Sequence, residues 1–214
     1  GLKYGEALTP EQAANLTTDM VWMVETEVMG QKVLAPVVYL SAATKAGFAS
    51  GAAIVGNDVN MDLASVTNTG GTMAGNFTLN ITSKGDIKNT SGTIKGGDVS
   101  LKSTDGSIIN ETFTATSGND VNGNTLIGKT GSIESTGNLK VDAAKDITNK
   151  GANMSAGGDA DLKAGGNITF DVIEDKKAET TYEGSGANKS TTTTNSSTSI
   201  GSGLKVGGNL KTES

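Results

Sequence analysis

The stretch GTIKGGDVSLKSTDGSI, residues 92–108, decides the fold of this chain. It reads as three short strands: one around Ile94, one over residues 97–101, and one that ends at Ile108. Apolar and polar residues alternate within each piece, so every second side chain points to the same side. Gly beside Asp or Asn at the joints is typical of turns that need a positive φ. The stretch therefore predicts one coil of three strands and three turns.

The same coil recurs along the chain with a period close to 21 residues. A first apolar set keeps this spacing except for one gap of 39, and consists of Val66, Ile87, Ile108, Ile147 and Ile168. A second set has the same gap and consists of Met73, Ile94, Ile133 and Met154. A third set follows the Gly-Asn or Gly-Asp pairs and consists of Leu79, Leu101, Val141 and Leu162. Three sets with one period predict an all-β fold, a parallel β-helix (β-solenoid) whose rungs stack these sets into a continuous core.

Asparagine recurs two residues after the markers of the first set. These residues are Asn68, Asn89, Asn110 and Asn149. Stacked rungs would bring their amides together as a ladder, each bonded to its neighbours above and below. The alternative is that they are ordinary turn residues.

Two segments depart from the repeat, at residues 109–130 and 171–200. Each has strand-like alternation on both sides of a turn cluster, SGNDVNGN in the first and GSGANK in the second. The pattern predicts two β-hairpin arms that leave the helix and return to it. The alternatives are disordered loops for both and, for the 39-residue gap, a hidden rung. After the second arm, Leu204, Asn209 and Leu210 resume the pattern of Ile133, Asn138 and Leu139.

Residues 1–50 differ from the rest. Thr9, Pro10 and Gln12 carry the signals of a helix start, which predicts a short helix over residues 10–16. Apolar strands over 20–28 and 31–40 flank Met29-Gly30 and predict a hairpin. We interpret residues 1–50 as a cap on the β-helix domain, which we assign to residues 51–214.

The composition excludes several kinds of chemistry. There is no His and no Cys, and all 17 basic residues are Lys. The chain therefore lacks an imidazole base, a thiolate nucleophile and the usual zinc ligands. The net charge of −6 argues against nucleic-acid binding, and no nucleotide-binding motif occurs. The pairs Asp159/Asp161 and Asp58/Asp62 do not recur with a third acid, so we expect no enzyme, metal site or cofactor.

The opening LTPEQAANLTTDMVWMVETEVMGQKVLAPVVYL resembles the stretch that introduces haemagglutinin repeats in large two-partner-secreted exoproteins. GTIKGGDVSLKSTDGSI and GANMSAGGDADLKAGGNITF resemble the repeats themselves. The family includes filamentous haemagglutinin and the contact-dependent growth inhibition effectors of CdiA type.

The resemblance implies a right-handed β-helix, secreted to the surface of a Gram-negative cell through an outer-membrane β-barrel partner. It implies a middle segment of a longer filament, without catalytic residues, that helps to deliver a toxin into neighbouring bacteria. The alternative is a filamentous adhesin that binds host cells or matrix. The surface of a target bacterium or of a host cell is then the partner.

Overall fold

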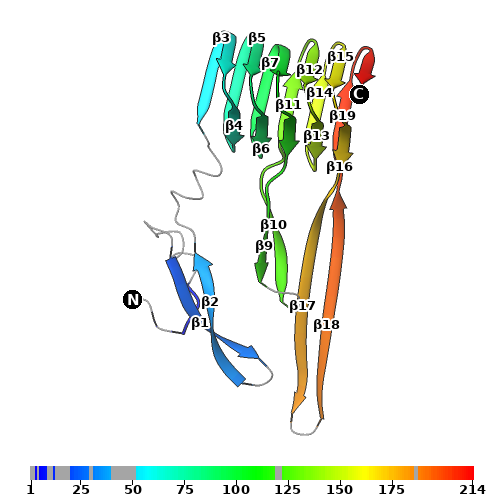
Figure 1. Cartoon of the computed structure of the whole chain (residues 1–214). Coiled ribbons are helices and arrows are strands. Elements are labelled where there is room, and N and C mark those ends of the chain that lie inside the picture. Colours follow the sequence, from blue (N-terminus) through cyan, green and yellow to red (C-terminus); the bar gives the residue numbers. More distant parts are fainter. Residues whose placement is uncertain are drawn as a thin grey trace. The chain divides into compact units, whose positions relative to one another are not determined.

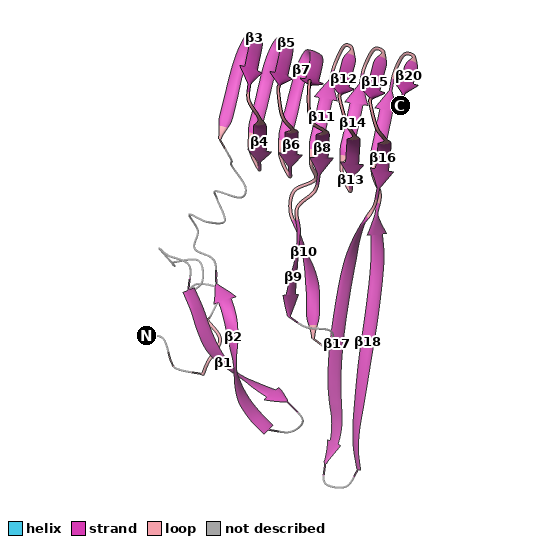
Figure 2. Ribbon diagram, viewed as in Figure 1, coloured by secondary structure: helices cyan, strands magenta, loops and turns pink. Residues whose placement is uncertain are grey.

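A parallel β-helix makes up most of the described chain. The computed structural model describes residues 3, 5–8, 12, 20–28, 31–39, 52–118, 122–185 and 188–214. The chain divides into two compact units, residues 1–50 with 179–194, and residues 51–178 with 195–214. The described residues are mostly in strands (Figure 2). The all-β, parallel β-helical class predicted from the repeat is confirmed.

Six rungs follow one another along the helix (Figure 1). Rungs 1 to 3 have two strands each: β3 (Ala53–Leu63) and β4 (Val66–Thr69), β5 (Thr72–Ser83) and β6 (Ile87–Thr90), β7 (Thr93–Ser103) and β8 (Ile108–Glu111). Rungs 4 and 5 have three each: β11 (Ser132–Ser135), β12 (Leu139–Ala143) and β13 (Ile147–Lys150), then β14 (Asn153–Ala156), β15 (Ala160–Ala164) and β16 (Ile168–Asp171). Rung 6 contains β19 (Gly203–Val206) and β20 (Leu210–Glu213).

The rungs stack in register through two parallel sheets. One has nine strands, and the other has five in the order β16-β13-β8-β6-β4. In the second sheet, Ile147 of β13 pairs directly with Ile108 of β8. The 39-residue gap therefore holds an insertion and no hidden rung.

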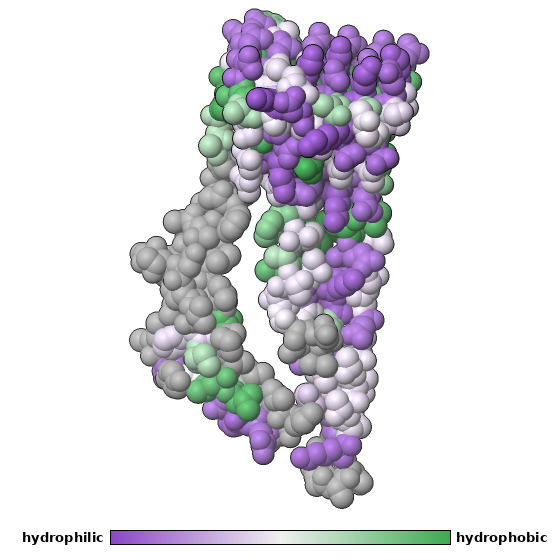
Figure 3. Space-filling model, in the orientation of Figure 1, coloured by the Kyte–Doolittle hydropathy of each residue, from purple (hydrophilic) through white to green (hydrophobic). Residues whose placement is uncertain are grey.

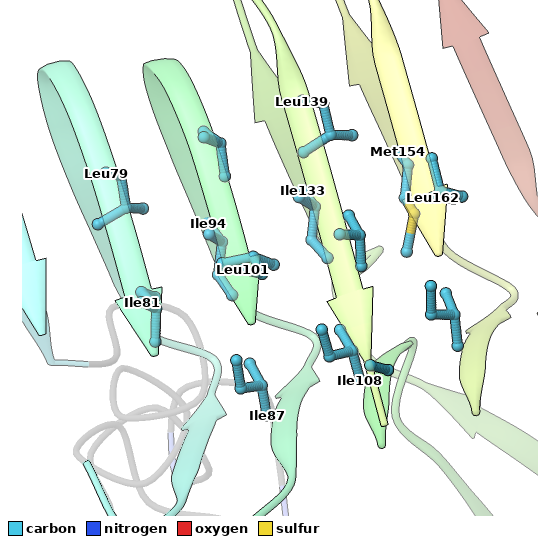
Figure 4. Packing of buried hydrophobic residues seen from close by; sticks show 14 of the residues in the cluster. Leu79, Ile81, Ile87, Ile94, Leu101, Ile108, Ile133, Leu139, Met154 and Leu162 are labelled. Carbon is cyan, nitrogen blue, oxygen red and sulfur yellow. The ribbon is translucent and has the colours of Figure 1, made fainter. Parts of the chain in front are cut away.

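A narrow apolar core runs between the two sheets (Figure 4). Eight of the nine residues in the first two apolar sets are at most 9% exposed: Val66, Ile87, Ile108, Ile147, Met73, Ile94, Ile133 and Met154. Ile168 of the last described rung of its sheet is partly buried and packs against them. The core contains no aromatic side chain among the described residues, which fits the low aromatic content of 4%.

The third apolar set was aligned wrongly at its first member. Leu79 pairs with Val99, whereas the residue that pairs with Leu101 is Ile81. The register shifts in β5 between Gly75 and Thr78. This bulge adds one residue to β5. The third apolar set therefore took Leu79 where the residue stacked on Leu101 is Ile81.

Two hairpins occupy the predicted arms. The first is β9 (Thr114–Gly118) with β10 (Gly123–Ile127), and the second is β17 (Ile173–Ser185) with β18 (Asn188–Ile200). The predicted bounds of both arms were too wide. Asn110 and Thr112 are buried in rung 3, and β16 extends to Asp171.

The hairpin predicted within residues 1–50 is confirmed. β1 (Met20–Val28) and β2 (Gln31–Tyr39) pair antiparallel, with Val28 opposite Gln31. Trp22 Nε1 donates to the Glu6 carbonyl at 2.9 Å, which attaches the preceding segment to β1. The predicted helix lies, apart from Gln12, outside the described residues, and the capping role stays a prediction. No helix in the described ranges has the length and hydropathy needed to span a membrane.

The stacked core predicts a sharp contrast between inward and outward substitutions. Ile108 is 0% exposed, so Ile108→Asp would place a carboxylate in the apolar core and cost at least about 3 kcal/mol. Lys102 is exposed on the outer wall, and Lys102→Thr should cost under about 0.5 kcal/mol. Chemical denaturation of both variants measures the difference. Equal losses would contradict the inward placement of Ile108.

Candidate functional site

A ladder of four asparagines runs along one inner corner of the helix. Asn68, Asn89 and Asn110 each donate from Nδ2 to Oδ1 of the next asparagine, with all three distances 2.8 Å and Asn149 as the last acceptor. All four are at most 5% exposed. The second amide hydrogen is also used, since Asn89 Nδ2 lies 2.9 Å from the Gly92 carbonyl. The ladder ends because the residue stacked on Asn149 in β16 is Phe170.

The glycines beside the ladder make room for it. A Cβ at Gly71 would lie 2.4 Å from Asn68 Oδ1, and a Cβ at Gly92 would lie 2.4 Å from Asn89 Oδ1. These glycines are therefore required because an asparagine amide lies so close to them, and not because of the turn geometry.

A second ladder follows an outer corner. Asp98 Oδ1 accepts the Asn138 backbone N–H at 2.7 Å, and Asn138 Oδ1 accepts that of Asp159 at 2.9 Å. Asp159 Oδ1 in turn accepts the Asn209 N–H at 2.7 Å. Each side chain thus bonds the turn of the following rung.

This arrangement corrects the explanation given for the Gly-Asn and Gly-Asp pairs. The positive-φ glycines of the described chain are Gly5, Gly70, Gly118 and Gly151, none of which precedes Asn or Asp in a corner pair. A Cβ at Gly137 would instead lie 2.3 Å from Asp98 Oδ1, and one at Gly158 would lie 2.5 Å from Asn138 Oδ1. The prediction of positive φ at these joints is wrong; the glycine leaves space for the acceptor of the preceding rung.

The acid pairs form no catalytic cluster. Asp159 serves the outer ladder, and Asp58 Oδ1 accepts from the Thr78 hydroxyl at 2.8 Å. Asp58, Asp62 and Asp159 are exposed, and Asp161 is only half-buried. Across the described ranges, no group of three or more acids is arranged to hold a metal ion. These carboxylates act as solvated or structural acceptors.

The two arms join in one four-stranded antiparallel sheet, here called the arm sheet, in the order β18-β17-β10-β9. Gly123 of β10 lies opposite Ala178 of β17, and Asn124 lies opposite Lys177. The Lys176 backbone N–H also donates to Thr125 Oγ1 at 3.0 Å. Sequence reasoning predicted two separate arms and missed this junction.

Strand spacing explains why the arms meet. β8 leads into β9 and β10 leads into β11, so the first arm connects rungs 3 and 4; β16, β17, β18 and β19 connect rungs 5 and 6 in the same way. At the end of rung 4, a short turn at Gly151 leads directly to rung 5. At the equivalent corner, after rungs 3 and 5, the chain instead forms the two arms. Neighbouring rungs and neighbouring strands share a spacing of about 4.8 Å. Arms at alternate corners therefore come out side by side at strand distance.

A hollow of about 440 Å³ lies over the junction of the arms. It is lined by polar groups around the small pair Gly123 and Ala178, among them Thr116, Thr125, Lys176, Asn195 and Ser197. Glu174 lies 2.6 Å from Lys176 Nζ, and this hydrogen-bonded ion pair raises the pKa of the lysine. Most of the residues that line the hollow carry a hydroxyl, amide or ammonium group.

Apolar surface gathers where the arms leave the helix. Phe113 is 43% exposed, Leu126 50%, Phe170 39% and Val172 44%. Figure 3 shows patches of hydrophobic surface below the polar wall of the rungs. Ile173, by contrast, is 3% exposed and packs against Gly151, which ties the second arm to the helix.

Comparisons with known proteins agree with this architecture. The Hemagglutinin repeat family matches residues 104–185. A deoxyribonuclease CdiA of Dickeya dadantii is 34% identical over 97% of this chain, and a 16S rRNA endonuclease CdiA of Enterobacter cloacae is 37% identical over 72%. A tRNA nuclease CdiA of Escherichia coli O6:K15:H31 is 31% identical over 91%. The chain spans only 5 to 7% of the length of these relatives. No solved structure matches it.

The asparagine ladder predicts a pH-dependent defect for Asn89→Asp. The carboxylate would face the Gly92 and Ser132 carbonyls and Asn110 Oδ1 without a proton to donate, at a cost of at least about 3 kcal/mol at pH 7. The site favours the protonated acid and raises its folded-state pKa, so the loss relative to wild type should shrink as the pH falls from 7 to 4.

Urea denaturation at both pH values measures this effect. Asn60→Asp is the matched control, because Asn60 is exposed and its Oδ1 acts as an acceptor for Asn80. A pH-independent deficit in Asn89→Asp would contradict the role of the ladder.

The arm junction predicts faster amide exchange after loss of one hydroxyl. Thr125→Val removes the acceptor of the Lys176 N–H, so exchange at Lys176 should accelerate about fivefold, as expected for one hydrogen bond. Thr116→Val makes the same change on the neighbouring strand β9, and hydrogen exchange at Lys176 should not respond to it. Equal rates in all three proteins would show that the arms separate in solution.

Proposed function

The chain belongs to the haemagglutinin-repeat regions of CdiA-type exoproteins, and from this premise we propose that it is a non-catalytic segment of a toxin-delivery filament. The filament is secreted through an outer-membrane β-barrel partner and stands on the surface of a Gram-negative cell. It carries a toxin to neighbouring bacteria by contact. The β-helix acts as the rigid scaffold, and the arm sheet makes contact with the target-cell surface.

The hydrogen bonds that polar side chains make between rungs support a scaffold role. Asn89, Asn138 and Asp159 bond adjacent rungs. Among the described residues, every buried side-chain nitrogen and oxygen has a hydrogen-bond partner. The chain has no histidine and no cysteine, so it offers neither an imidazole for proton transfer nor a thiolate for nucleophilic attack.

The names of the relatives favour toxin delivery over the adhesin alternative. The three CdiA relatives compared above are named as nucleases of different specificity, for DNA, 16S rRNA and tRNA. This chain is similar to all three over 72 to 97% of its length. A region shared by nucleases with different substrates fits a common delivery role, and we place the nuclease activity of those proteins outside the matched segment.

The arm sheet carries the single observation that supports contact. It departs from the repeated rung while the rungs on both sides stay in register, since Met154 pairs with Leu204 across the second arm. Distinctive loops on a rigid scaffold are where proteins usually bind partners.

Replacement of residues 175–198 by a short Gly-Ser turn tests this proposal. Ile173 and the rungs remain, so the variant chain should fold and melt within a few degrees of wild type. In the full-length exoprotein, inhibition of target bacteria in mixed culture should fall at least about tenfold.

Two controls accompany this variant: its amount on the cell surface, measured by antibody, and target cells that carry the matching immunity protein. Unchanged inhibition at equal surface level would contradict the contact role of the second arm. Inhibition unaffected by loss of both arms would contradict it for the whole sheet.

A further inference from the structure

The outer edge of the arm sheet is a long, unprotected strand. β18 has 13 residues and lies at one end of the sheet order, so no described strand pairs with its outer side. Residues 190–200, STTTTNSSTSI, contain no charge, no proline and no glycine. Residues 190–199 are exposed, and Figure 3 shows a pale surface of intermediate hydropathy over β17 and β18. Such an edge offers a row of backbone donors and acceptors to another strand.

The other edge strands of the described sheets are protected. Charged residues lie in β1, β2, β3, β16, β19 and β20; examples are Glu25, Lys32, Asp62 and Lys211. The remaining two, β4 and β9, have only 4 and 5 residues. Charge and shortness are the usual means by which proteins prevent edge-to-edge pairing. β18 has one charged residue, Lys189 near its start, and none along residues 190–200, which are rich in the good β-former threonine.

We propose that β18 pairs antiparallel with β18 of a second copy of this chain, so that two arm sheets join into one continuous eight-stranded sheet. A twofold axis through Asn195 makes the contact self-complementary. In that register Thr191 lies opposite Ser199 of the second copy and Thr193 lies opposite Ser197. Every cross-strand pair within residues 190–200 is then uncharged.

The self-complementary, uncharged register favours a second copy as the occupant. The chain as a whole carries −6, so two copies repel each other over most of their surface. Residues 190–200 carry no charge, so two copies can meet at this edge without like charges facing each other. One threonine pair already bridges two strands of this sheet, since the hydroxyls of Thr180 and Thr193 lie 3.0 Å apart across β17 and β18.

A single strand pair buries little surface, so the association is weak between isolated chains. Filaments anchored side by side on one cell raise the effective concentration of the edges. The pairing would therefore bundle neighbouring filaments laterally.

Two double variants that differ at one position test the proposal. Thr191→Lys with Ser199→Lys places lysine opposite lysine twice in the dimer. Thr191→Glu with Ser199→Lys places glutamate opposite lysine twice. Within one chain, the Thr180–Thr193 contact places Thr191 beside Tyr182 and Ser199 beside Glu174. The lysine introduced by Ser199→Lys therefore has the same favourable neighbour, Glu174, in both variants.

Sedimentation equilibrium of the 214-residue chain gives the dimer dissociation constant. Wild type should show a concentration-dependent dimer. The lysine-lysine variant should have a dissociation constant about tenfold or more above that of the glutamate-lysine variant, and about 1 M NaCl should narrow the gap. Circular dichroism checks that both variants are folded.

Three results would overturn the proposal: a monomeric wild type at every concentration, equal dissociation constants for the two variants, or a lysine-lysine variant that dimerises more tightly. A fourth would be protection of the β18 amides by a further arm in a longer chain that stays monomeric. If this proposal fails, the proposed role in toxin delivery is not contradicted, because the measurement uses the isolated chain and no target cell.

Discussion

Parallel stacking in register is the constraint on which the whole structure depends. Each side chain lies over its counterpart one rung away, as Ile147 lies over Ile108 and Asn149 over Asn110. The demands on the sequence therefore act along the helix axis: apolar over apolar, amide over amide, and glycine where the acceptor of the preceding rung needs room. A residue that fails this match disturbs two interfaces at once, because every inner rung has two neighbours.

The same constraint explains how a chain with 35% hydrophobic residues can fold. The core consists of Ile, Leu, Val, Met and Ala side chains that lie between the sheets. At the corners of the helix, amide and carboxylate side chains form hydrogen bonds with the backbone of the turns. Apolar side chains could not make these bonds. Asn89 alone bonds two asparagines and two carbonyls of neighbouring turns. Backbone and side-chain hydrogen bonds thus supply the order that a thicker apolar core supplies elsewhere.

The features of this structure that could be predicted from the sequence are those that repeat. The period of 21 residues appears in the sequence because stacking requires it, so the fold class, the two arms and the return of the pattern at Leu204 could be predicted. The bulge at Gly75 could not, since one extra residue changes the register without changing the composition. The role of Gly137 and Gly158 was also hidden, because a glycine required by close approach and a glycine required by positive φ look alike in sequence.

The arm sheet shows both the reach and the limit of such reasoning. Alternating residues predicted each hairpin, but nothing within either segment indicates its partner. The signal lay in the distance between them: one regular corner, between rungs 4 and 5, separates the two insertions, and the strands of rungs 3 to 6 are spaced like the strands of a sheet. A corner that accepts a hairpin leaves the register of the core unchanged, as the pairing of Met154 with Leu204 shows. The scaffold can therefore keep its rungs while its arms vary, and the contact that we propose for the arms could change without any change in the core.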